Sequence, residues 1–194
     1  MQNELIQTRL FNLRKLMAAK KIDYYMIPTA DFHNSEYVSD YFKVREYFSN
    51  FTGSNGTLIV WQEGAGLWTD GRYFIQAEKE LEGTGITLYR MQEEGVPTIE
   101  EFLKERIPVG GGLGFDGRTI SAKQGQKYEK ALQEKKIRFA YEEDLAENLW
   151  KDRPAFPAGR AYVIPKEIAG KSVAEKLSEV RAKIIKKISD ENGQ

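Results

Sequence analysis

Apolar residues along the chain follow two different periods, and these periods predict where helices and strands form. Between residues 2 and 20 the apolar positions, Leu10 and Leu13 among them, recur at the three- and four-residue spacing of one helix face. The next apolar run, 22–27, lacks this period and stops at Pro28, which cannot donate a hydrogen bond to a neighbouring strand. We therefore expect a first helix followed by a buried strand.

Two short apolar runs, 57–62 and 67–69, flank the glycine-containing turn 63–66, and this arrangement predicts an antiparallel hairpin. Asp70 follows the hairpin and is expected to cap a helix, whereas Arg45 is expected to point outward from an earlier one. Further helices are predicted at 35–41, 43–49, 71–82, 98–106, 121–134 and 144–150, and further strands at 86–91, 113–115 and 137–139. Strands interleaved with helices predict an α/β fold, a mixed β-sheet flanked by helices on both faces.

A change of composition at 152–159, which holds two prolines and a glycine, predicts a linker. Residues 1–157 and 158–194 are therefore treated as separate parts. In the second part Ser172 opens a helix with Leu177 on its apolar face. A single amphipathic helix cannot bury its apolar face by itself. It must dock onto the first part, dimerise, or be the first helix of a domain whose remainder lies outside this sequence, and we favour the last alternative.

Composition removes several classes of function. The 29 basic residues equal the 29 acidic ones, so no net charge favours nucleic acid, and no window approaches the ~20 apolar residues of a membrane span. With no cysteine and one histidine, His33, the chain excludes thiolate metal sites, two-histidine zinc sites and any serine–histidine–acid triad that does not use His33. Acidic runs such as 142–144 are interpreted as solvated faces, with Asp144 as a helix cap. We expect no catalytic residue and no metal ligand here, and a cytoplasmic location.

The most informative stretch is the strand-to-helix corner that contains Trp68, Asp70 and Arg72. An arginine can hold a carboxylate or a peptide carbonyl through two parallel hydrogen bonds, or clamp another domain through an ion pair. Equally, Arg72 can pair with Asp70 inside the domain or with Glu36 on its surface. His33, in a polar loop, either lines the same face or only forms a hydrogen bond within its loop. Trp68 is typical of a core or a domain interface.

Several motifs occur together in an order and spacing typical of one family. They are Ile27-Pro28, His33-Asn34-Ser35-Glu36-Tyr37, Arg45-Glu46-Tyr47, Phe51-Thr52-Gly53-Ser54-Asn55-Gly56-Thr57, Trp68-Thr69-Asp70-Gly71-Arg72-Tyr73-Phe74 and Leu149-Trp150-Lys151-Asp152-Arg153-Pro154. Over about residues 20–157 the chain resembles the N-terminal domain of the three-domain Xaa-Pro aminopeptidases (aminopeptidase P), within the creatinase/prolidase group. Residues 158–194 look like the linker and first helix of that family's middle domain, truncated.

The resemblance implies a ribonuclease H-like fold and a parent protein with a separate catalytic domain. That domain holds two metal ions, usually manganese, which activate water to cleave the bond between an N-terminal residue and proline. The resemblance also implies the remaining domains of the parent chain and a second copy in a homodimer as partners, short proline-containing peptides as substrates, and neither nucleic acid nor membrane. It places Arg72, His33, Asp70 and Trp68 at substrate-binding or domain-interface positions.

There are two hypotheses of function. In the first, the chain is a non-catalytic N-terminal domain that contributes to oligomerisation and narrows the entrance to the metal site, so that long or folded chains are excluded. In the second, it is a stand-alone peptide- or carboxylate-binding module that uses Arg72 and neighbouring aromatic residues. Creatinase- or prolidase-like chemistry in the parent is a third alternative.

Overall fold

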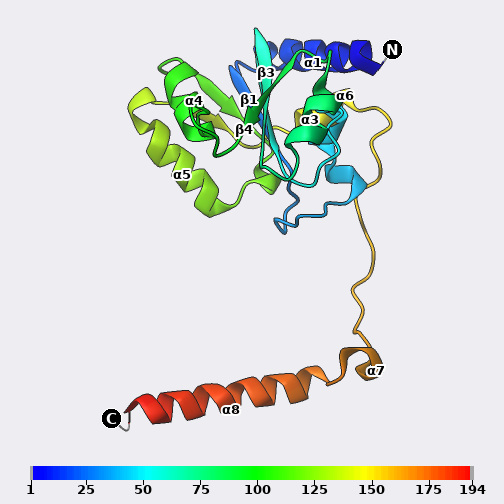
Figure 1. The fold of residues 1–194 in the computed structure, drawn as a ribbon, viewed down its shortest axis with the longest axis vertical. Coiled ribbons are helices and arrows are strands. Elements are labelled where there is room, and N and C mark those ends of the chain that lie inside the picture. The colour runs from blue at the N-terminus through cyan, green and yellow to red at the C-terminus, as the bar shows by residue number, and fades with distance from the viewer. Residues whose placement is uncertain (1, 193–194) are drawn as a thin grey trace. The chain divides into compact units, whose positions relative to one another are not determined.

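The computed structural model describes residues 2–192, and the chain divides into two compact units whose boundary falls between Pro157 and Ala158. The first unit contains one six-stranded sheet in the order β4-β3-β2-β1-β5-β6 (Figure 1). The strands are β1 (Tyr24–Pro28), β2 (Thr57–Trp61), β3 (Gly64–Thr69), β4 (Ile86–Arg90), β5 (Gly112–Gly114) and β6 (Arg138–Ala140). Strand β2 runs antiparallel to β1 and β3, and the other neighbouring pairs are parallel. The predicted mixed sheet is confirmed.

Helices cover both faces of this sheet, as predicted: α4 and α5 lie on one face, and α1, α3 and α6 on the other (Figure 1). The helices of the first unit are α1 (Gln2–Ala19), α2 (Val44–Ser49), α3 (Phe74–Leu81), α4 (Ile99–Arg106), α5 (Ala122–Leu132) and α6 (Leu145–Leu149), with 3-10 turns η1 (Asp40–Phe42), η2 (Gly117–Thr119) and η3 (Gln133–Lys135). Capping boxes open α4 and α5. They satisfy backbone N–H groups that the first helical turn leaves without partners.

Strand β1 explains why there are two hydrophobic cores. Side chains alternate across a strand, so Tyr25 and Ile27 point to one face and Tyr24 and Met26 to the other. The first pair belongs to the core beneath α1, α2, α3 and α6, and the second to the core beneath α4 and α5. Because both faces are buried, the strand appears in the sequence as a continuous apolar run.

Three local expectations are wrong. Residues 35–41 form no helix before η1, because the Asp31 carboxylate accepts hydrogen bonds from the backbone N–H groups of His33 and Ser35 and turns the chain there. The hairpin turn is shorter than predicted, since Trp61 already pairs with Gly64. Helix α3 begins at Phe74 after an N-cap at Tyr73, so Asp70 caps no helix.

A fourth expectation, that Arg45 points outward, is also wrong: only 5% of Arg45 is exposed. Its guanidinium donates to Thr29 Oγ1 at 2.7 Å and to the carbonyl oxygens of Phe51 at 2.7 Å and Gly53 at 2.5 Å. All three of these acceptors are uncharged, and burial lowers the pKa of Arg45 to about 10. Arg45 therefore fixes the glycine-rich segment that follows α2.

The second unit contains α7 (Lys166–Ala169) and α8 (Val173–Asn192). The predicted helix after Ser172 is confirmed, and its apolar residues Val173, Leu177, Val180 and Ile184 are all exposed. Whether α8 belongs to a further domain stays a prediction. Among the described residues, no helix is long and apolar enough to cross a membrane.

Candidate functional site at the carboxyl edge of the sheet

Five of the six strands point the same way, so their carboxyl ends meet at one edge of the sheet. Ligands of α/β proteins characteristically bind at this edge, where the connecting loops begin. Two copies of one tripeptide lie here. Asp70-Gly71-Arg72 follows β3, and Asp116-Gly117-Arg118 comes two residues after the end of β5.

Both tripeptides fold into the same fork. In the first, Asp70 Oδ1 accepts hydrogen bonds from the backbone N–H and Nε of Arg72, both at 3.0 Å, and Oδ2 accepts from Nη2 at 2.9 Å. In the second, Asp116 Oδ1 accepts from the backbone N–H of Arg118 at 3.0 Å and from Nε at 2.9 Å, and Oδ2 accepts from Nη2 at 2.8 Å. The carboxylate thus holds the guanidinium plane of the second following residue in a fixed orientation.

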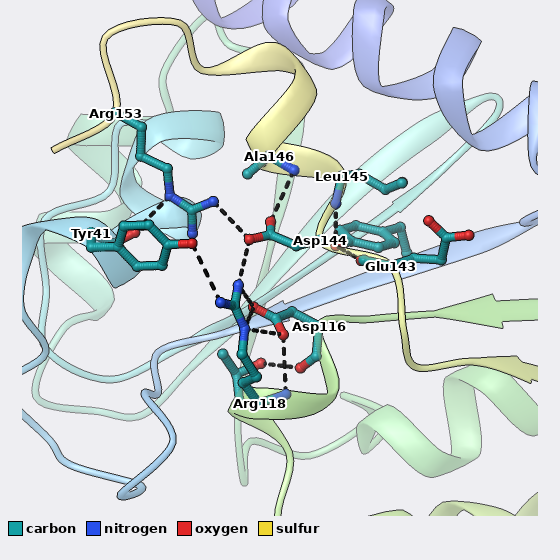
Figure 2. A network of polar contacts seen from close by, with 10 residues as sticks. Tyr41, Asp116, Arg118, Glu143, Asp144, Leu145, Ala146 and Arg153 are labelled. Atoms are coloured by element: carbon teal, nitrogen blue, oxygen red, sulfur yellow. Dashed lines mark hydrogen bonds and ion pairs between the residues drawn. The ribbon is translucent and has the colours of Figure 1, made fainter. Parts of the chain in front are cut away.

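The Arg118 fork is closed by residues from later in the chain, as Figure 2 shows. Asp144 Oδ2 lies 2.6 Å from Arg118 Nη2 and 2.7 Å from Arg153 Nη1. Arg153 also donates from Nε to the Tyr41 carbonyl at 2.9 Å, and its guanidinium stacks over the Tyr41 ring at 3.8 Å. The side chains of Asp144 and Arg153 are only 11% and 7% exposed, so the Asp144–Arg153 pair is buried, whereas Arg118 is 41% exposed. The network acts as a structural clamp.

Asp144 is the helix cap that the sequence predicts, but it is not part of a solvated face. Its Oδ1 accepts from the Ala146 N–H at 3.2 Å, and this bond caps α6. In addition, its carboxylate joins two arginines that are far apart in sequence. A run of three acidic residues contains no sign of this, because the partners are set by the tertiary fold.

The Arg72 fork remains open. The Arg72 side chain is 60% exposed, and beyond Asp70 its charged neighbour is Glu36, whose Oε1 lies 3.5 Å from Nη1. Asn55 Nδ2 donates to Asp70 Oδ2 at 2.5 Å and steadies the carboxylate from the other side. Hydrogen bonds from Arg72 hold the pKa of Asp70 well below its usual value, and Asp70 in turn raises the pKa of Arg72. The fork is a permanently charged, oriented donor that faces solvent.

A polar cleft of about 350 Å³ adjoins this fork. Arg72, Asn34, Glu36 and Asn55 line it, together with Gln124 from the first turn of α5. Asn34 has a left-handed backbone with φ of 56°, a conformation that asparagine tolerates better than most residues. The cleft therefore gathers amide, carboxylate and guanidinium groups around one opening.

The other two predicted site residues lie elsewhere. His33 is exposed, and its ring packs at 4.0 Å against Phe32, outside the residues that line the Arg72 cleft. Trp68 is 1% exposed, stacks on Tyr89 at 4.0 Å and donates to the Pro97 carbonyl at 2.9 Å. The structure thus brings Asp70 and Arg72 together and leaves Trp68 in the core beneath α4 and α5.

Within residues 2–192, no group of three or more histidine, cysteine, aspartate or glutamate side chains is arranged to hold a metal ion. The carboxylates at this edge are instead paired with arginines.

Comparison with known proteins identifies the fold family. Residues 9–144 match the model of the creatinase/prolidase N-terminal domain. The chain belongs to this family. The resemblance inferred from its motifs is thereby confirmed.

Relatives of this creatinase/prolidase domain are longer proteins. The chain is 36% identical over 186 residues to aminopeptidase P2 of Arabidopsis thaliana, a match that covers 93% of this chain and 26% of the relative. It is 39% identical over 178 residues to a probable Xaa-Pro aminopeptidase P of Aspergillus flavus, covering 91% and 27%. The chain thus spans little more than a quarter of the length of these relatives.

Among solved structures, the X-prolyl aminopeptidase of Caenorhabditis elegans, described as a cytosolic enzyme with a di-nuclear active site, superposes with a TM-score of 0.80 at 29% identity. That match covers 94% of this chain and 31% of the worm enzyme. The Xaa-Pro aminopeptidase of Streptococcus thermophilus shares the fold alone, with a TM-score of 0.54 at 15% identity.

Proposed function

We propose that this chain is the non-catalytic N-terminal domain of an Xaa-Pro aminopeptidase, and that Arg72 faces the substrate channel of a catalytic domain that lies outside it. The observation that carries the proposal is the contrast between the two Asp-Gly-Arg forks. The Arg118 fork is closed by Asp144, whereas the Arg72 fork has the same geometry and stays open. Similarity to Xaa-Pro aminopeptidases supports the choice of substrate class.

Arg72 is suited to binding peptide. Asp70 already orients the guanidinium, so little side-chain entropy is lost when a peptide carbonyl or carboxylate binds. Arg72 cannot act as a general base, because Asp70 raises its pKa further. In the proposed parent, two metal ions, manganese in our proposal, would be held by the catalytic domain and would supply the activated water for peptide cleavage. The di-nuclear active site of the worm relative supports the two metal ions proposed for the parent.

Steady-state kinetics of the full-length protein test the role of Arg72. We expect Arg72→Ala to lower kcat/KM for an Xaa-Pro peptide by about tenfold or more, the loss of a charge-assisted pair, with little change in Tm. Arg72→Lys keeps the charge but loses the fork and should restore only part of the activity. Arg118→Ala is the matched control, because it breaks the same fork where no ligand is proposed. It should lower Tm more than Arg72→Ala does, and kcat/KM less than Arg72→Ala does.

A second measurement tests the non-catalytic assignment. The 194-residue chain alone is incubated with manganese and a proline-containing peptide, and we expect no hydrolysis. Metal-dependent cleavage by the 194-residue chain alone would overturn the assignment.

The same proposal includes three further roles: a homodimer contact, a narrowed substrate entrance and a cytoplasmic location. The cytosolic worm relative supports the location. Light scattering on the full-length protein should give the mass of a dimer, and kcat/KM should fall steeply as peptides lengthen. A monomer, or equal rates for short and long peptides, would remove the corresponding role.

A further inference from the structure

A second cleft, of about 410 Å³, lies beside the Arg72 cleft and has a different chemistry. Tyr37, Val38 and Phe42 contribute its apolar lining, and Glu46 and Lys43 are among its charged residues. Phe42 is buried, whereas Tyr37 is 82% exposed. The second cleft therefore presents apolar side chains next to charged ones.

The two clefts share a wall. Thr29, Glu36 and Ser54 line both, and Ser54 Oγ donates to Glu36 Oε1 at 3.0 Å. The same Ser54 Oγ lies 2.7 Å from Tyr73 Oη. Glu36 therefore stands between the polar cleft that contains Arg72 and a second cleft in which apolar and charged side chains are mixed.

Hydrogen bonds connect the backbone segments beneath both clefts. Arg45 lines the second cleft, and its guanidinium donates hydrogen bonds to Thr29 Oγ1 and to the carbonyl oxygens of Phe51 and Gly53. Thr29 in turn donates from its N–H and its hydroxyl to the Gly56 carbonyl, at 2.8 and 3.0 Å. A preformed wall of this kind lowers the entropic cost of binding a flexible ligand.

We propose that the two clefts form one groove for a short peptide, whose C-terminal carboxylate binds Arg72 while the apolar side chain of its last residue packs against Tyr37 and Val38. The lining gives the direction: Arg72 lines the first cleft and can pair with the carboxylate, whereas Tyr37, Val38 and Phe42 line the second, in which Glu36 and Glu46 balance Lys43 and Arg45. The clefts share Glu36 and Ser54 in their lining, so an extended peptide, which advances about 3.3–3.6 Å per residue, passes directly from one into the other. Because the groove gives Arg72 a peptide-binding role, it rests on the function proposed above and adds a preference for peptides with an apolar C-terminal side chain.

The test is an NMR titration of the 194-residue chain with three synthetic peptides: Ala-Pro-Gly-Phe, Ala-Pro-Gly-Gly, and Ala-Pro-Gly-Phe with an amidated C-terminus. We expect the phenylalanine peptide to bind about tenfold more tightly than the glycine peptide, the discrimination that one apolar side chain supplies. Its amide shifts should include residues 36–43. Amidation, or Arg72→Ala, should weaken binding of the phenylalanine peptide at least about tenfold, since each removes the ion pair.

Two variants distinguish binding in the groove from nonspecific binding to exposed aromatic side chains. Tyr37→Ala should bring the two peptides to similar affinity, whereas Tyr162→Ala, which removes an equally exposed tyrosine (84%) from the second unit, should change nothing. Equal affinity for the phenylalanine and glycine peptides, or no measurable binding, overturns the groove but leaves the proposed function intact if Arg72→Ala still lowers kcat/KM in the full-length protein. A phenylalanine preference without that kinetic effect leaves the groove standing and defeats the proposed function.

Discussion

Replacing Asp144 with asparagine should destabilise the first unit much more than its position in a loop suggests. The substitution keeps the side-chain shape and an oxygen that can cap α6, but it removes the charge that Arg118 and Arg153 share. Because the Arg153 side chain is 7% exposed, its cation is left in a low-dielectric setting without an anion. Breaking one partner of a buried ion pair costs about 3–5 kcal/mol, and we take the lower end, about 3 kcal/mol, since Arg118 is 41% exposed and keeps Asp116.

Urea and thermal unfolding followed by tryptophan fluorescence measure this cost. A loss of about 3 kcal/mol corresponds to a fall in Tm of about 6–12 °C for a domain of this size. The double variant Asp144→Asn with Arg153→Met should lose less free energy of unfolding than the sum of the losses in the two single variants. The reason is that Arg153→Met removes the buried cation that Asp144→Asn leaves unpaired.

The matched control is the pair of Arg90 and Glu78, which has the same 2.7 Å separation but side chains 37% and 61% exposed. Glu78→Gln should cost less than about 1 kcal/mol, because water screens an exposed pair. If Asp144→Asn and Glu78→Gln lower the free energy of unfolding equally, burial is not what gives the Asp144 network its strength, and the reasoning is refuted.

Two further predictions concern the predicted site residues themselves. Trp68→Ala should cost about 3–5 kcal/mol of stability, as for other buried aromatic residues, and a loss below about 1 kcal/mol would show that Trp68 is not part of the core. Because Arg72 holds the folded-state pKa of Asp70 below its unfolded value of about 3.9, the Asp70 carboxylate stabilises the fold above about pH 4, and this contribution is lost as pH falls toward the folded pKa. The Tm difference between wild type and Asp70→Asn, worth at most about 1 kcal/mol at this partly exposed site, should therefore shrink below pH 4; a difference that is constant from pH 7 to pH 2 contradicts the pairing.

Sequence patterns predict most of the secondary structure because the signals are local. The capping box that begins at Thr98 places α4 correctly, and the continuous apolar run around Tyr24–Pro28 identifies a strand buried on both faces. The errors occur where a side chain finds its partner in the tertiary fold. Arg45 has the composition of a surface residue, yet the carbonyl oxygens that bind it lie six and eight residues further along and become available only when the glycine-rich segment folds back.

The candidate site is predictable only in part. The sequence points to Asp70 and Arg72 and leaves open whether they pair with each other or bind a ligand. In the structure the pairing and the exposure coexist, because Asp70 uses one side of the guanidinium and leaves the Nη1 side facing Glu36 and the solvent. Sequence reasoning missed Asp116-Gly117-Arg118, although it repeats the tripeptide, and searching the sequence for that repeat would have found it.

The two Asp-Gly-Arg forks show how one local motif acquires two roles. Spacing within the tripeptide is enough to form the fork, so the geometry is the same at both places. The role of each fork depends on its neighbours. Asp144 and Arg153, from the end of the first unit, form ion pairs that make the Arg118 fork part of a clamp. The Arg72 fork lies next to the half-exposed Glu36. Arginine without a fully buried partner keeps donors available for a ligand. Glu36 already lies 3.5 Å from Arg72 Nη1, so the forks differ in the distance and burial of the second carboxylate: Asp144 lies 2.6 Å from Arg118 Nη2 and is 11% exposed, whereas Glu36 is 50% exposed.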